Sequence, residues 1–169
     1  MKVGEETGEE KLSRAVFNEQ VRKAKDYALN LLTYRPRSCQ EIRDKLRGKH
    51  YPEKVLEKVI ARLRELNLLD DKQFARLWVE SRLLNKPLGR RLLEQELRQK
   101  GIGSEIVEKV CESAYREQGE EEIALELARK RLKRYGNPDD FAVKRRLYGY
   151  LGRRGFPPDT ISGVLEKLF

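Results

Sequence analysis

Several residue types that support common chemistries are scarce in this sequence of 169 residues. His50 is the only histidine, and the two cysteines, Cys39 and Cys111, are isolated rather than paired as CxxC. Neither a zinc site nor a disulfide framework is therefore indicated, and we expect reduced thiols and no metal or cofactor. No apolar run approaches about 18 residues, and the acidic start MKVGEETGEEK lacks the apolar core of a secretion signal. We therefore expect a cytoplasmic protein with no membrane contact.

Glycine and proline are also few, with 12 and 6 residues, whereas charged and hydrophobic residues each make up 38% of the chain. This composition is rich in helix formers and poor in residues typical of strands and turns. No stretch alternates apolar and polar residues over several positions, as a half-buried strand would. The sequence therefore predicts an all-α protein. Its net charge of +9 points to a polyanion or an acidic protein surface as the partner.

Apolar residues recur at spacings of three and four from Asn18 onward, which predicts amphipathic helices. The first such stripe comprises Val21, Ala24, Ala28 and Leu31. Pro36 should end this helix, and Ser38 with Glu41 forms the capping-box pattern that starts the next one. The residues before Asn18 are acidic and contain few apolar side chains, so we expect residues 1–17 to form a mobile tail.

One motif occurs three times, as LRGKHYPEKVLEKV from Leu46, LRQKGIGSEIVEKV from Leu97 and LGRRGFPPDTISGV from Leu151. The spacing leaves room for three short helices in each unit. We therefore expect tandem three-helix repeats at residues 18–69, 70–118 and 119–169. Such units share their cores with their neighbours, which predicts an elongated, curved rod.

The alignment of the three motifs also decides how the G-x-G element in LRQKGIGSE is interpreted. A dinucleotide-binding loop needs a preceding strand and free backbone N–H groups at the glycine positions. Gly103 aligns with Pro52 and Pro157, and proline has no N–H group. We therefore interpret Gly101 as the C-terminal residue of a helix and Ser104 as the cap of the next helix.

Basic residues are concentrated in the second and third repeats, most clearly in RKRLKR and in KRRLYGYLGRR. Arginine forks suit phosphates or carboxylates, tyrosine can stack on bases, and glycine permits close approach. A solvated helix face is the alternative interpretation of the same charges. The candidate contact residues are Arg90, Arg91, Arg98, Lys100, Arg129, Lys130, Lys133, Arg134, Arg145, Arg146, Tyr150, Arg153 and Arg154.

Two other functional classes fit the sequence less well. A helix-turn-helix repressor reads bases with the start of its last helix, but the last helices here open PEKVLEKV, SEIVEKV and PPDTISGV. These openings are acidic or neutral where phosphate would be closest. A small hydrolase would need a pocket with perturbed carboxylates or His50, whereas most glutamates lie four residues from a basic residue as surface pairs. We therefore predict that the protein is not an enzyme.

From about Lys23 to the C-terminus, the chain resembles the bacterial RecX family of proteins that regulate the recombinase RecA. The most specific part is LNLLDDKQFARLWVESRLLNKPLGRRLLEQELRQKGI, with its Asp-Asp and Phe-Ala opening, Trp78, Arg82 and the region of Gly89. The resemblance implies a non-enzymatic protein that lies along the groove of the RecA filament on DNA. It implies inhibition of the filament's ATPase, strand exchange and growth, together with some affinity for DNA.

Two further expectations concern partners. We expect a monomer, because no apolar helix face is obviously unpaired in the sequence. The alternative to a filament regulator is a nonspecific single-stranded DNA-binding protein that has no recombinase target. Such a protein would bind naked DNA with a steep salt dependence, since each phosphate contact releases counterions.

Overall fold

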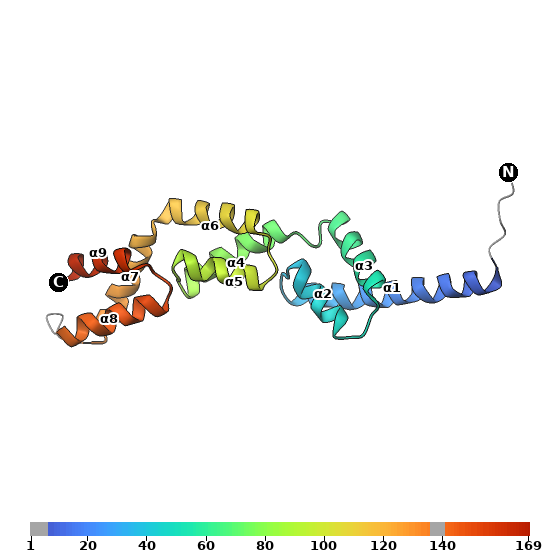
Figure 1. Ribbon diagram of the computed structural model, residues 1–169, viewed down its shortest axis with the longest axis horizontal. Helices are drawn as coiled ribbons and strands as arrows, with labels where there is room; N and C mark the ends of the chain where they lie inside the picture. Colours follow the sequence, from blue (N-terminus) through green and yellow to red (C-terminus); the bar gives the residue numbers. More distant parts are fainter. Residues whose placement is uncertain (1–6, 136–140) are drawn as a thin grey trace. The chain divides into compact units, whose positions relative to one another are not determined.

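The computed structural model describes residues 7–135 and 141–169, and every regular element within these ranges is an α-helix (Figure 1). The helices form three consecutive groups of three, which confirms the predicted all-α fold of tandem three-helix repeats. They are α1 (Gly8–Tyr34), α2 (Cys39–Arg47), α3 (Glu53–Glu65), α4 (Asp71–Asn85), α5 (Arg90–Gln99), α6 (Ser104–Gln118), α7 (Glu120–Leu132), α8 (Phe141–Arg153) and α9 (Pro158–Leu168).

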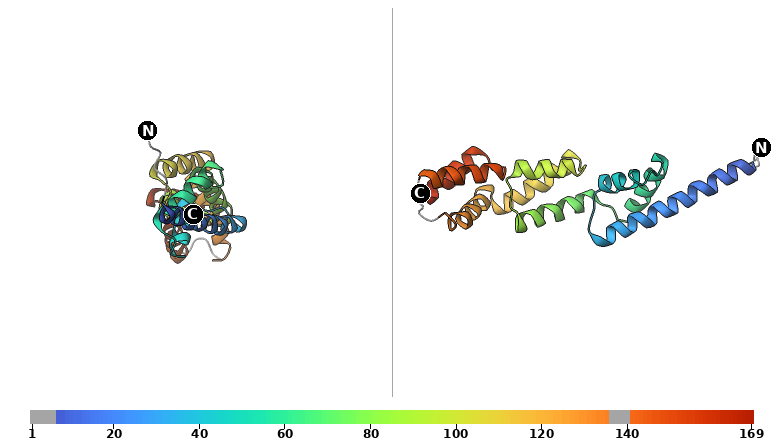
Figure 2. Two further views of the ribbon diagram at one scale, coloured as in Figure 1. Left: turned by 90° about the vertical axis from the view of Figure 1, so that its right-hand side faces the viewer. Right: turned by 90° about the horizontal axis from the view of Figure 1, so that it is seen from below.

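The chain divides into two compact units, Met1–Asp71 and Lys72–Phe169. The first unit holds α1 to α3 around a core that includes Ala28, Leu46 and Leu56. The second unit holds the other six helices, and a single buried cluster runs through both of its repeats. Within it, α5 packs against α6, and α8 and α9 both pack against α7 (Figure 2).

Helix α1 begins at Gly8, ten residues before the start at Asn18 that the apolar periodicity suggests. A capping box formed by Thr7 and Glu10 starts the helix early. It lies in an acidic segment with few apolar residues, so the apolar periodicity gave no sign of it. Thr7 N donates to Glu10 Oε2 at 2.8 Å, and Glu10 N donates to Thr7 Oγ1 at 3.4 Å. The predicted mobile tail at residues 1–17 is therefore helical from Gly8 on, and its residues 1–6 lie outside the described ranges. The capping box predicted at Ser38 and Glu41 is confirmed.

The three aligned turns share one backbone geometry. A residue with positive φ closes each helix, and the next N–H group returns to the carbonyl of the motif's leucine at 3.1 to 3.4 Å. The positive-φ residues are His50 at 61°, Gly101 at 76° and Gly155 at 83°. This geometry confirms Gly101 as a helix terminus. Ser104 is not the cap, however, because Gly103 occupies the N-cap position and makes no side-chain bond there.

The segment before α5 joins the two repeats of the second unit through hydrogen bonds to its backbone. Gly89 N donates to the carbonyl of Arg154 at 2.7 Å, and the buried Tyr115 hydroxyl donates to the carbonyl of Leu88 at 2.7 Å. The backbone N–H of Arg90 donates to Glu120 Oε1, also at 2.7 Å. Because buried backbone groups are costly to leave unpaired, the bonds to Arg154 and Glu120 fix the third repeat against the second. The bond from Tyr115 holds the same segment to α6 within the second repeat. We call residues 87–90 the junction segment.

We expect Gly89→Ala to destabilise the second unit by about 2 kcal/mol or more. A Cβ atom at this position would lie 2.2 Å from the carbonyl oxygen of Gly155, and both groups belong to backbone that cannot move aside. Urea unfolding followed by the fluorescence of Trp78, the single tryptophan, measures the change. Gly103→Ala is the control, because a Cβ there meets nothing within 4 Å. Equal midpoints for the two variants would contradict the packing argument.

The two free thiols should react slowly while the chain is folded. Burial, followed for Cys39 by the nearby Asp71 carboxylate, raises the pKa of both cysteines to about 11 from an ordinary value of 9.0. Since the thiolate is the reactive form, alkylation by iodoacetamide should stay slow in native protein until the pH approaches 11. In urea the same reaction should accelerate near the ordinary pKa. Rapid native labelling at pH 8 would contradict the described burial.

Candidate polyanion-binding surfaces

Two of the predicted contact residues on α5 already pair with a carboxylate. Arg90 Nε lies 2.8 Å from Glu94 Oε1, and Arg98 Nη2 lies 3.2 Å from Glu94 Oε2. The hydrogen bond that Arg90 donates to Glu94 raises the pKa of Arg90. A phosphate would have to compete with Glu94 for both guanidinium groups, so they are weaker candidates than unpaired arginines. Arg91 is exposed beside them.

Lys100 belongs to a cluster that holds α4 to α5. Its Nζ atom lies 4.7 Å from the ring centroid of Trp78, and the Arg82 guanidinium lies 4.8 Å from the same centroid. Glu96 Oε2 accepts from Trp78 Nε1 at 3.0 Å and from Arg82 Nε at 2.7 Å. These contacts give Lys100 a structural role.

Tyr150 does not present the open ring that the sequence suggested. It is half-buried against the core, and the guanidinium groups of Arg131 and Arg154 lie 5.0 and 5.4 Å from its ring centroid. Arg154 Nη1 also approaches the carbonyl oxygen of Pro87 at 3.4 Å. The periodicity of α8 alone could not show this arrangement, because Arg131 and Pro87 come from other parts of the chain.

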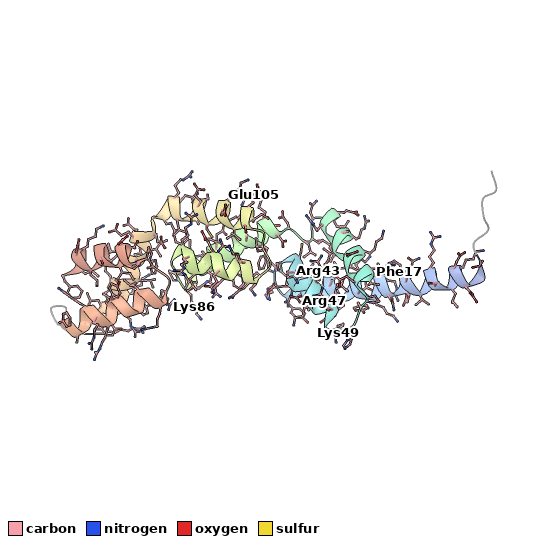
Figure 3. All side chains as sticks on the ribbon, viewed as in Figure 1. Phe17, Arg43, Arg47, Lys49, Lys86 and Glu105 are labelled. Atoms are coloured by element: carbon pink, nitrogen blue, oxygen red, sulfur yellow. The ribbon has the colours of Figure 1, made fainter. Side chains whose placement is uncertain are left out.

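Tyr150 lines a groove of about 760 Å³ between the end of α4, α7 and α8. Its apolar lining includes Leu83 and Leu127, and Glu122 and Glu126 contribute negative charge. The cations that line it are Lys86, which is labelled in Figure 3, Lys130, Arg131, Arg134 and Arg154. Sequence reasoning missed Lys86 and Arg131 as members of this group. Lys130 is 3.5 Å from Glu126, so part of the groove's charge is neutralised internally.

A second basic surface covers the side of α8 that points away from the core. Arg145, Arg146 and Arg153 are exposed and make no hydrogen bond or ion pair with any residue that the structure describes. The helix FAVKRRLYGYLGR contains no acidic residue, so these charges are not offset along it. Arg129 and Lys133 are also exposed, at the end of α7 and directly after it.

Two aromatic rings on the same side of α8 were not among the predicted residues. Phe141 is 77% exposed and Tyr148 is 41% exposed. Their spacing from Arg145, four residues before and three after it, places the three side chains along one helix stripe. This spacing is the signal that could have identified them. We call the outward face of α8 the exposed Phe141, Arg145, Arg146, Tyr148, Gly152 and Arg153 together with the half-buried Gly149.

No three His, Cys, Asp or Glu side chains gather in the described ranges as metal ligands would. None of the helices described is long and apolar enough to cross a membrane.

Comparisons with known proteins give matches along the chain. The RecX first three-helix domain matches residues 24–63, the second matches 70–110 and the third matches 119–165. Regulatory protein RecX of Amycolatopsis mediterranei is 40% identical over 88% of this chain and 85% of that protein. Regulatory protein RecX of Prosthecochloris aestuarii is 38% identical over 87% of this chain and 94% of that protein.

Solved structures agree with these matches. The crystal structure of RecX from Lactobacillus salivarius superposes with a TM-score of 0.78 at 28% identity, covering 89% of this chain and 97% of the other. A second crystal structure, of regulatory protein RecX, gives a TM-score of 0.80 at 26% identity over 98% of this chain and 81% of the other.

We expect neighbouring arginines of α8 to differ in their effect on stability. Arg154→Ala removes contacts with Tyr150 and Pro87 and should cost about 1 kcal/mol. Arg153→Ala removes an exposed side chain that pairs with no residue in the described ranges, and should change stability by no more than about 0.5 kcal/mol. Chemical unfolding curves of the two variants test this difference. The assignment of Arg154 to the groove fails if Arg153→Ala is the more damaging change.

Proposed function

Because the chain belongs to the RecX family of regulatory proteins, we propose that it binds the filament that the recombinase RecA forms on DNA. In this proposal it inhibits the filament's ATPase, strand exchange and growth by binding, without catalysis of its own. The observation that carries the proposal is that the three RecX three-helix domains match this chain in order, from residue 24 to residue 165.

The proposed contacts are the predicted basic residues, ordered by whether a carboxylate already holds them. The outward face of α8 comes first, because its arginines are exposed and pair with none of the residues that the structure describes. The groove beside Tyr150 comes next, since its cations converge on one cavity. Arg90 and Arg98 come last, because binding would have to release them from Glu94. An arginine that leaves a carboxylate to bind a phosphate gains little net free energy, because one ion pair replaces another. Arginines already held by Glu94 therefore rank below the others.

The alternative function, nonspecific binding of single-stranded DNA without a recombinase target, draws support from the same exposed arginines of α8. The two proposals differ in what the filament adds. A plain DNA binder gains nothing when protein covers its strand, and its affinity should fall steeply with salt. A filament regulator should prefer the coated strand, because the recombinase supplies contacts that bare DNA lacks.

We expect binding to single-stranded DNA coated with RecA and a nonhydrolysable nucleotide to be at least about tenfold tighter than binding to the bare strand at matched salt, a difference of about 1.4 kcal/mol. Fluorescence anisotropy with a labelled chain measures both affinities. The double change Arg145→Glu and Arg153→Glu should weaken filament binding without lowering the melting temperature.

The matched control reverses two cations of α6 in the same unit, Lys109→Glu and Arg116→Glu, which each face a glutamate four residues away. This control has the same net charge as the α8 variant and should bind the filament more tightly than that variant does. Equal or tighter binding to the bare strand by the unmodified chain would favour the plain DNA binder.

A further inference from the structure

Two glycines on the outward face of α8 have no packing reason to be glycine. A Cβ atom at Gly149 would meet only the flexible end of Arg153 at 3.4 Å, and one at Gly152 would meet Ile161 Cδ1 at 4.0 Å. Both distances are ordinary contacts, unlike the 2.2 Å clash at Gly89. Glycine inside a helix destabilises it relative to alanine. The packing of the described residues therefore gives no reason for glycine at these two positions.

The side chains around the glycines supply a charge and a flat apolar surface. Arg145, Arg146 and Arg153 have no partner among the described residues and no acidic neighbour on their helix. Phe141 and Tyr148 expose their rings between and beside these arginines. A ligand with several negative charges and several flat groups would satisfy both kinds of side chain, and the glycines would let it approach the helix closely.

Single-stranded nucleic acid has this combination, since its phosphates are accessible and its bases are unpaired. A duplex offers the phosphates but keeps its base faces stacked inside. Phe141 and Tyr148 are seven residues apart, which is about 10 Å along the helix axis. Successive bases of one B-form strand are only about 3.4 Å apart, so the two rings match bases of an extended strand better than stacked neighbours.

The groove beside Tyr150 is the weaker candidate for the same ligand. The guanidinium groups of Arg131 and Arg154 already lie over the Tyr150 ring, so a base would have to displace a cation to stack there. Glu122 and Glu126 line the same cavity and would repel phosphates. The two basic surfaces of α8 therefore differ in chemistry.

We propose that the outward face of α8 binds single-stranded nucleic acid, with Arg145, Arg146 and Arg153 on its phosphates and the rings of Phe141 and Tyr148 stacked on unpaired bases. The inference deepens the proposed function, on which it rests for its biological setting, by assigning the DNA of the filament to this face. It concerns bare DNA directly, so its main test needs no recombinase, and filament binding serves only to separate the outcomes.

The test uses the full chain with a fluorescein-labelled oligo(dT) strand and with a labelled duplex of the same length, followed by anisotropy at several salt concentrations. The double change Phe141→Ala and Tyr148→Ala should weaken single-strand binding by about tenfold for each ring and leave duplex binding unchanged. Tyr34→Ala, at an 84% exposed ring of α1, is the matched control and should bind both DNAs normally.

Two further variants separate charge from stacking. Arg145→Glu with Arg153→Glu should weaken both DNAs and reduce the salt slope on the single strand by about 1.4, the value for two phosphate contacts. Gly149→Leu should weaken single-strand binding while the melting temperature stays the same or rises, because leucine favours the helix more than glycine does. If Gly149 had only a structural role, Gly149→Leu would not weaken single-strand binding while keeping or raising the melting temperature.

The inference is overturned if the two ring substitutions leave oligo(dT) binding unchanged, or if they weaken single strand and duplex equally. Loss of filament binding with unchanged bare-strand binding would assign this face to an acidic protein segment instead, and would also overturn it. If the ring substitutions act on the bare strand as expected but the unmodified chain shows no preference for the coated strand, the proposed function fails and this inference stands. Unchanged Trp78 emission in each variant verifies that the second unit is folded.

Discussion

The second unit depends on the hydrogen bonds that the junction segment makes with α6, α7 and the turn after α8. Gly89 donates to the Arg154 carbonyl, Tyr115 donates to the Leu88 carbonyl, and Glu120 accepts from the N–H of Arg90. These bonds require glycine at position 89, because the chain passes too close to Gly155 for any side chain. They set the position of α8 relative to α4 and α7, and with it the shape of the groove and the direction of the outward arginines.

The arginines of the second unit differ in whether a carboxylate already holds their guanidinium group. Arg82 and Arg90 are held by Glu96 and Glu94, so binding an anion would replace one carboxylate contact by another. Arg145 and Arg153 have no such contact to lose among the described residues. The net charge of +9 therefore includes arginines held by carboxylates and arginines that pair with no carboxylate among the described residues.

Local signals in the sequence were sufficient for most of the fold. The box at Ser38 and the repeated leucine motif predicted helix starts and turns that the structure confirms, because caps and left-handed turns depend on residues within one or two helical turns. The early start of α1 was missed because its first turns bury no stripe, and only Thr7 with Glu10 marks it. Tyr150 was misplaced for the opposite reason, since its surroundings depend on distant residues. Arg131 of α7 flanks its ring, and Arg154, which also flanks it, approaches the carbonyl oxygen of Pro87 in the junction segment.

The three equivalent turns also differ in strain. Two of them place glycine at the left-handed position, whereas the first places His50 there with φ of 61°. A left-handed non-glycine residue costs roughly 1 kcal/mol, and the unit that contains it has the smaller buried core. The first unit should therefore open locally at a lower free-energy cost than the second unit. Local opening should cost less free energy at the His50 turn than at the Gly101 turn, so the backbone amides near His50 should exchange with solvent faster. The three turns therefore share a geometry but differ in rigidity.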